Sequence, residues 1–280
     1  MEITVFLAVI AAAFMHASWN LLVKLELDRF LSLFLLQTLM GLMGIAMLFF
    51  FAWPARESLP YALVSGLLHT GYNIFLARSY RQGDLSQVYP IARGTAPLLT
   101  LLATWIIAHE HIGLLTTLGI GALVLGIWLI AVGRSKTLQI DRASLLFALG
   151  TSGFIAAYTV VDGLGGRISG AASGYTATVF ILDAVFLLMA AFYMRGPGII
   201  ISVAPYWKSG LAGAFLSAAA YWIIIWAMTQ APIAAVAALR ETSILFVLAM
   251  SAYYLKERMT WSRGLGGALV VLGAITLRLS

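Results

Sequence analysis

The chain has 280 residues, of which 62% are hydrophobic and only 10% are charged, and it contains no cysteine. Its mean hydropathy of +0.97 is typical of an integral membrane protein, because one soluble core could not bury so many apolar groups. The absence of cysteine excludes disulfides and cysteine-ligated metal centres, and we expect no cofactor and no metal site. The net charge of +6 comes from thinly spread basic residues, so no nucleic-acid partner is expected.

The apolar residues fall into segments long enough to cross a bilayer, which takes roughly 20 residues per helix. The first segment has no basic region before it, so we predict a retained spanning helix and not a cleaved signal. The sequence predicts an all-α integral membrane protein with ten transmembrane helices, at about 3–23, 30–53, 59–80, 85–107, 112–133, 143–162, 172–194, 209–229, 232–255 and 262–279. The connections between these segments are too short to hold a soluble domain.

The two halves of the chain resemble each other. A shift of 147 residues aligns 66–133 with 213–280 and superimposes Arg93 on Arg240 and Glu110 on Glu257, so both halves carry an Arg and a Glu 17 residues apart. Charged residues are rare in these segments, so this coincidence carries more weight than the aliphatic matches.

Each half contains five predicted spans. Because five is odd, the second half begins on the opposite side of the membrane from the first and has the inverted orientation. We therefore predict two inverted five-helix repeats, at 1–133 and 143–280, joined by a connecting loop at 134–142. Inverted repeats are typical of transporters that work by alternating access. Because one chain already holds both repeats, it need not dimerise, and we favour a monomer.

Lysine and arginine are unevenly distributed between the two ends of the predicted bundle. The connections that follow odd-numbered helices carry 12 basic residues, whereas the opposite side carries three. By the positive-inside rule, the basic side is cytoplasmic and both termini lie outside.

Arg93 lies inside the predicted span 85–107, about 12 Å from its start at 1.5 Å per residue. A charged side chain at mid-helix costs about 2.5–3.5 kcal/mol on insertion scales, so it usually faces protein or a water-filled cavity. Arg240 lies at the matching depth of span 232–255, with Glu241 beside it. Pro97, one turn after Arg93, leaves the Arg93 carbonyl without its helical hydrogen bond and marks a place where the helix can bend.

Several other spans carry polar and aromatic side chains at helical spacing, which predicts one cavity with aromatic walls. A guanidinium in such a cavity would hold a carboxylate, so the cavity suits a zwitterionic or aromatic metabolite. The candidate cavity-lining residues are His16, Trp19, Asn20, Tyr72, Asn73, Tyr89, Arg93, Tyr158, Tyr221, Trp222, Arg240 and Glu241. Asp162, Asp183 and Glu241 are the candidates for ion pairing or for carrying a coupling ion.

The same residues also have structural interpretations. The two arginines could pair with Glu241, Asp162 or Asp183 and only fix the register of the helices. Most aromatic residues in membrane proteins pack or sit at the interface, and His16 and His69 could simply bond to neighbouring helices.

Two further groups are interpreted as structural. Glu110 and Glu257 lie at helix ends, where we expect solvated groups that help to define turns. Glycines seven residues apart in both halves indicate close helix packing: Gly119, Gly126, Gly266 and Gly273.

With these motifs, the chain resembles the drug/metabolite transporter superfamily, and in particular its ten-helix EamA-type exporters. The resemblance rests on "TAPLLTLLATWIIAHE" after Arg93-Gly94 and on "ALRETSILFVLAMSAYYLKERMTWSRGLGGALVVLGAITL" in the second half. "HASWNLLVK" and "AYTVVDGLG" look like paired motifs of a subgroup, possible amino-acid exporters. The first half has His111 where the second has Arg258, which departs from symmetry at this signature.

The resemblance implies a secondary transporter of the plasma (bacterial inner) membrane that exports or exchanges small polar metabolites, with amino acids as the preferred class. The alternatives are a lipid-linked sugar, nucleotide-sugar or sugar-phosphate translocator of the same fold, since fold alone does not fix substrate. An intramembrane enzyme is less favoured, because no HExxH, paired-aspartate protease or GxSxG motif occurs. The expected partners are a small-molecule substrate and the lipid bilayer.

Overall fold

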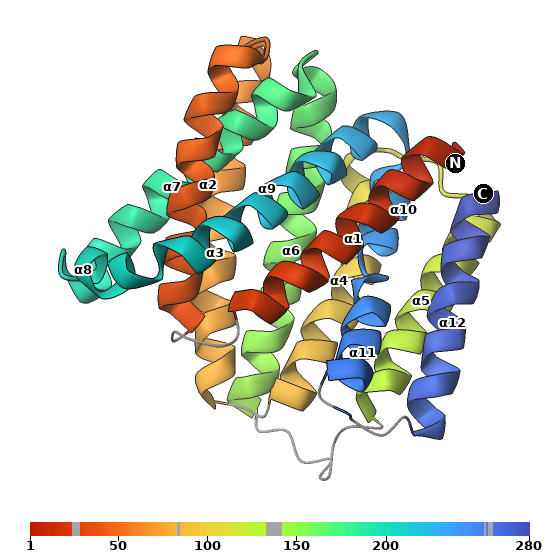
Figure 1. Cartoon of the computed structure of the whole chain (residues 1–280). Helices are drawn as coiled ribbons and strands as arrows, with labels where there is room; N and C mark the ends of the chain where they lie inside the picture. The colour runs from red at the N-terminus through yellow and green to blue at the C-terminus, as the bar shows by residue number, and fades with distance from the viewer. Residues whose placement is uncertain (24–28, 83–84, 133–141, 255, 257–259) are drawn as a thin grey trace.

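The computed structural model describes residues 1–23, 29–82, 85–132, 142–254, 256 and 260–280, and these residues form helices joined by short connections (Figure 1). The helices are α1 (Ile3–Val23), α2 (Arg29–Phe50), α3 (Leu59–Gln82), α4 (Leu85–Ile107), α5 (Leu114–Val132), α6 (Arg142–Ile168), α7 (Ala172–Arg195), α8 (Ile199–Val203), α9 (Trp207–Gln230), α10 (Ile233–Arg240), α11 (Ser243–Tyr254) and α12 (Trp261–Leu279). Two short 3₁₀ turns are η1 (Arg56–Ser58) and η2 (Ala204–Tyr206).

The predicted membrane fold is confirmed. Eight helical segments of the described chain are long and apolar enough to cross a bilayer, and α4 adds a shorter apolar stretch, Ile91–Ile107. Helix α3 has 24 residues but is not among these segments, because it is less apolar and carries polar groups such as His69 and Asn73. The protein is therefore an all-α membrane protein of two inverted five-helix repeats.

The last helices of the two repeats, α5 and α12, lie side by side at one edge of the bundle (Figure 1). A Cβ atom on Gly126 would lie 2.6 Å from the Gly266 carbonyl oxygen, and one on Gly273 would lie 2.6 Å from the Gly119 carbonyl oxygen. The two helices are antiparallel, and the shift of 147 residues exchanges these two contacts. The predicted role of these glycines in close packing is confirmed, and their arrangement is that of a pseudo-two-fold axis between the repeats.

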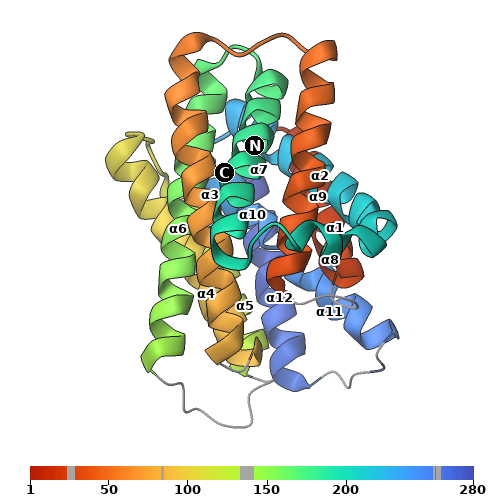
Figure 2. The same ribbon diagram turned by 90° about the vertical axis from the view of Figure 1, so that its left-hand side faces the viewer.

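The other helix pairs repeat in the same way. Helix α2 packs against its counterpart α7, α1 packs against α9, and α3 packs against α6. Figure 2 shows α7 between α2 and α3, and it contacts both. Both repeats therefore contribute helices to the centre of the bundle.

The ninth predicted span differs from the expected single helix, because it is divided into α10 and α11. At the break, the Glu241 and Thr242 amides donate to carbonyls three residues earlier, Ala238 and Leu239, at 3.0 Å each. Such a tightened turn inside a spanning helix often marks a hinge, and no Gly or Pro signals it here. In contrast, α4 remains one helix through Pro97.

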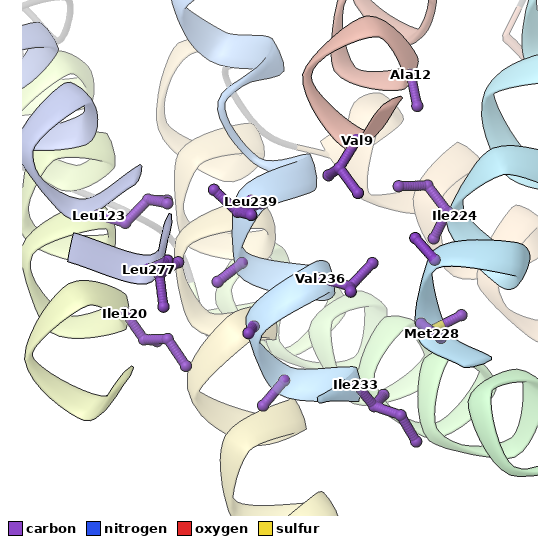
Figure 3. Packing of buried hydrophobic residues seen from close by; sticks show 14 of the residues in the cluster. Val9, Ala12, Ile120, Leu123, Ile224, Met228, Ile233, Val236, Leu239 and Leu277 are labelled. Atoms are coloured by element: carbon purple, nitrogen blue, oxygen red, sulfur yellow. The ribbon is translucent and has the colours of Figure 1, made fainter. Parts of the chain in front are cut away.

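Helix α10 passes through the middle of the apolar core. All eight of its residues are buried, and Figure 3 shows side chains of α1, α5, α9 and α12 converging on it. Its apolar residues Ile233, Val236 and Leu239 are fully enclosed. The core therefore encloses α10, which ends at the buried residue Arg240.

Glu110 is not the solvated turn residue that we expected. Its Oε1 atom accepts hydrogen bonds from Arg167 Nη2 at 2.7 Å and from the Ile233 amide at 3.0 Å. Arg167 also donates to the carbonyls of Met228 and Ala231, at 2.8 and 3.0 Å. This clasp joins the α4–α5 connection to the ends of α6 and α9 and the start of α10. Glu257, its counterpart, lies outside the described residues.

Replacing Gly126 by alanine should destabilise the fold. The new Cβ would meet backbone atoms of Gly266 and Val270 at 2.6 and 2.8 Å, so α5 and α12 must move apart, at a cost of about 1–3 kcal/mol. The free energy of unfolding in a denaturing-detergent titration measures this effect. Gly121→Ala on the same helix is the control, because its Cβ meets nothing within 4 Å. Equal stability of the two variants would contradict the proposed packing.

Candidate functional site

A cavity of about 80 Å³ lies at the centre of the bundle, between helices of both repeats. Its wall combines aliphatic and aromatic side chains with a few polar groups. Nine predicted site residues line it, namely His16, Trp19, Tyr72, Asn73, Arg93, Tyr158, Asp183, Tyr221 and Arg240. Gln37, Met40, His69, Phe180 and Ser217 also contribute to the wall.

Glu241 connects the two predicted arginines behind the cavity wall. Its Oε2 atom lies 3.1 Å from Arg93 Nε, and its Oε1 atom lies 3.7 Å from Arg240 Nε. All three side chains are at least 92% buried. Since Arg93 comes from α4 and the other two residues from the α10–α11 break, this interaction joins the repeats at the hinge.

Arg93 makes a second contact, with His16 of α1. Its Nη2 atom lies 2.7 Å from His16 Nε2. A guanidinium has only donors, so Nε2 must be the unprotonated nitrogen and the histidine proton lies on Nδ1. Trp19 Nε1 lies 3.3 Å from His16 Nδ1 and is also a donor. A neutral histidine has one acceptor nitrogen, so we assign the acceptor to Nε2, which makes the shorter contact with Arg93.

Arg240 is less fully bonded than Arg93. Its Nε atom is buried without a hydrogen-bond partner, and the 3.7 Å approach to Glu241 is too long for a hydrogen bond. Its side chain lines the cavity. An unsatisfied buried donor costs about 1–3 kcal/mol, so this guanidinium is suited to a partner that enters the cavity.

Asp162 lies deeper in the wall and is held by two tyrosines. Tyr175 donates to its Oδ1 atom at 3.1 Å and Tyr221 donates to its Oδ2 atom at 2.5 Å. The carboxyl group is fully buried. The Arg240 side chain lines the cavity, whereas Asp162 is bonded to the two tyrosines.

Aromatic rings form one side of the cavity. His69 stacks on Tyr158 with ring centroids 4.0 Å apart, and Tyr72 and Tyr221 meet Tyr158 edge to face. Asn73 lies beside them, fully buried, and neither atom of its amide has a hydrogen-bond partner. The wall thus combines aromatic rings with an amide that has no hydrogen-bond partner.

Two candidates with described side chains, Asn20 and Trp222, lie outside the cavity wall. Asn20 donates to the His16 carbonyl at 2.9 Å, and Trp222 donates to Ser173 Oγ at 3.0 Å while its ring meets Phe51. Tyr89 belongs to a stretch of α4 whose side chains the structure does not describe.

Gln37 was not among the predicted site residues. It donates from Nε2 to Asp183 Oδ2 at 2.6 Å and lines the cavity. The sequence signal that could have identified Gln37 is that it is the one amide side chain in the apolar span 30–53. The Glu110–Arg167 clasp was also missed, because its partners lie 57 residues apart and neither sits inside a predicted span.

Comparison with known proteins identifies the family. The EamA-like transporter family matches residues 3–132 and 142–279, which is nearly the whole chain. The chain belongs to the EamA-like transporter family. The EamA-like family is part of the drug/metabolite transporter superfamily, so the protein is a multi-pass membrane transporter and its setting is the lipid bilayer. No curated protein matches the chain.

Solved structures support the EamA-like fold. One crystal structure, described without a function, has a TM-score of 0.74 and 15% identity, covering 100% of this chain and 98% of its own. In all, 29 chains of solved structures match. At this identity the likeness shows the fold alone.

Replacing Glu241 by glutamine should destabilise the EamA-like protein strongly. The substitution leaves two guanidiniums facing each other without their shared carboxylate, at a cost on the order of 3 kcal/mol. Thermal unfolding of the purified protein measures the loss. Glu57→Gln is the control, because Glu57 is exposed. An unfolding midpoint as high as that of the control would show that Glu241 does not hold the repeats together.

Proposed function

We propose that the protein moves small metabolites with a carboxylate group, preferably amino acids, through its central cavity by alternating access, as an exporter or exchanger. The observation that supports this best is Arg240, a buried guanidinium that lines the cavity and whose Nε lacks a hydrogen-bond partner. A planar guanidinium matches a carboxylate with two parallel hydrogen bonds.

The rest of the cavity favours a zwitterion over a simple anion. The aromatic rings of Tyr72 and Tyr158 line the cavity, and such rings can attract an ammonium group. The unpartnered Asn73 amide offers both a donor and an acceptor. A substrate with a carboxylate at one end and an ammonium at the other uses both sides of the wall.

Alternating access requires one end of the cavity to be closed while the other opens. The Glu110–Arg167 clasp supports closure at the end that carries both termini, since it joins α6, α9 and α10 there. The α10–α11 break supplies a hinge at cavity depth. With the lysine and arginine distribution, we place this clasped end outside the plasma membrane and the basic end in the cytoplasm.

A sugar-phosphate or nucleotide-sugar substrate is the alternative, because two guanidiniums can also hold a phosphate. The structure gives this alternative less support, since Arg93 is already bonded to Glu241 and His16. One chain contains both repeats, so the proposed transporter works as a monomer.

Arg240→Lys should abolish most transport while leaving the fold intact. A lysine keeps the positive charge but loses the paired donors, so we expect a 10- to 100-fold weaker substrate affinity, from about 1.4–2.8 kcal/mol of lost binding free energy. Counterflow in proteoliposomes, with labelled amino acids, amines and sugar phosphates, measures transport and substrate class together. Trp222→Phe is the matched control, because Trp222 lies outside the cavity wall. Transport of amines or sugar phosphates without amino acids would contradict the proposed substrate class.

Arg167→Gln should open the clasped end. The chain has no cysteine, so S217C places a single thiol on the cavity wall. A membrane-impermeant maleimide added from the side of the termini should label S217C at least 10-fold faster when Arg167→Gln is also present, because the substitution removes three hydrogen bonds. Labelling at an unchanged rate would show that the clasp does not close this end.

A further inference from the structure

Asp183 is a further ionisable group of the cavity wall, and it takes no part in the arginine–glutamate bridge. It lies in the middle of α7, which runs between α2 and α3 (Figure 2). Its side chain lines the cavity and is 2% exposed. Gln37 donates to its Oδ2 atom, whereas its Oδ1 atom is buried and has no hydrogen-bond partner.

The groups that face Asp183 do not neutralise it. Helix α2 contributes the neutral Gln37, and α3 contributes His69, whose Nδ1 lies 3.0 Å from the Ser65 carbonyl. Helix α6 contributes Tyr158, which lines the cavity with Asp183, and Asp162, an acid that supplies no positive charge.

Two other elements complete these surroundings. Helix α9 contributes Tyr221, which is bonded to Asp162, and α8 carries no titratable residue. No ion pair joins Asp183 to a cation among the residues that the structure describes.

A count of the buried charges distinguishes the Asp183 carboxyl from the other acids near the cavity. Glu241 approaches both guanidiniums, and Asp162 accepts hydrogen bonds from Tyr175 and Tyr221, which stabilise its charged form, so these two acids equal Arg93 and Arg240 in number. An ionised Asp183 would add an uncompensated negative charge with only one hydrogen bond, and isolated buried charges of this kind are very costly. Asp183 therefore requires a cation: a bound proton in the empty cavity, or the ammonium of a substrate.

We propose that Asp183 is the proton-binding site that couples transport to a proton gradient, with one proton exchanged for one zwitterionic substrate. This proposal rests on the proposed function. When the substrate enters, its ammonium replaces the proton as the cation beside Asp183, and its carboxylate meets Arg240. The displaced proton leaves to the side that the cavity faces. After the substrate is released on the other side, a proton from that side returns to the carboxylate, so proton and substrate move in opposite directions.

The first experiment needs no substrate. Infrared difference spectroscopy of the purified protein across pH detects the carbonyl stretch of a protonated carboxyl. We expect a protonated carboxyl at neutral pH in the wild type and its loss in Asp183→Asn, with no loss in Glu57→Gln. A wild-type spectrum without this band, or a band that persists in Asp183→Asn, overturns the proposal and leaves the proposed transport function untouched.

The second experiment measures coupling in proteoliposomes with labelled L-alanine and L-phenylalanine. A proton gradient should drive accumulation by the wild type at least 10-fold above exchange without a gradient. Asp183→Asn should not respond to the gradient, whereas Asp183→Glu, which keeps a titratable carboxyl, should respond with a displaced pH profile. The Glu variant covers the case in which Asp183→Asn fails to fold.

The outcomes separate the two proposals. Wild-type counterflow without any response to the gradient overturns the proton site alone. A response that survives Asp183→Asn but disappears in His69→Gln assigns the proton to His69 and also overturns it. Absence of counterflow for either amino acid contradicts the proposed function, whatever the infrared result.

Discussion

The structure depends on one shared carboxylate, that of Glu241, which approaches two arginines inside a membrane protein. Each arginine alone would carry a large desolvation cost in this setting. Because Arg93 belongs to the first repeat and Arg240 to the second, the carboxylate compensates both charges only when the repeats are assembled. The same residue lies at the break between α10 and α11, so charge compensation and the candidate hinge coincide.

Sharing the carboxylate makes the two symmetry-related arginines unequal. Arg93 is bonded on both sides, to Glu241 and to His16, and so serves mainly to hold α1, α4 and the hinge together. Among the residues that the structure describes, Arg240 makes only the longer approach to Glu241, and its side chain lines the cavity. The pseudo-symmetry of the fold thus positions two guanidiniums, and our proposal is that Glu241 holds Arg93 in the structure and leaves Arg240 for a ligand.

The fold could be predicted almost completely from the sequence, because long apolar segments and a 147-residue repeat with rare charged residues leave few alternatives. The close packing of the glycines in α5 and α12 could also be predicted, because they recur at the same spacing in both halves of the sequence. The α10–α11 break was not, since the strongest helix-breaking signal, Pro97, lies in α4, which stays continuous. The Gln37–Asp183 and Glu110–Arg167 contacts were also unpredictable, because each joins segments distant in sequence. Asn20 and Trp222 show that helical spacing alone does not decide which face of a helix meets the cavity.

The most direct test of the account is the position of a bound carboxylate relative to the two arginines. Solid-state NMR of the protein in lipid, with a ¹³C-carboxylate amino acid and ¹⁵N-labelled arginine, measures this through dipolar coupling between the two labels. The account predicts a close contact that disappears in Arg240→Lys and therefore belongs to the Arg240 guanidinium. A contact that survives in Arg240→Lys, or no contact with any arginine at saturating substrate, would contradict it.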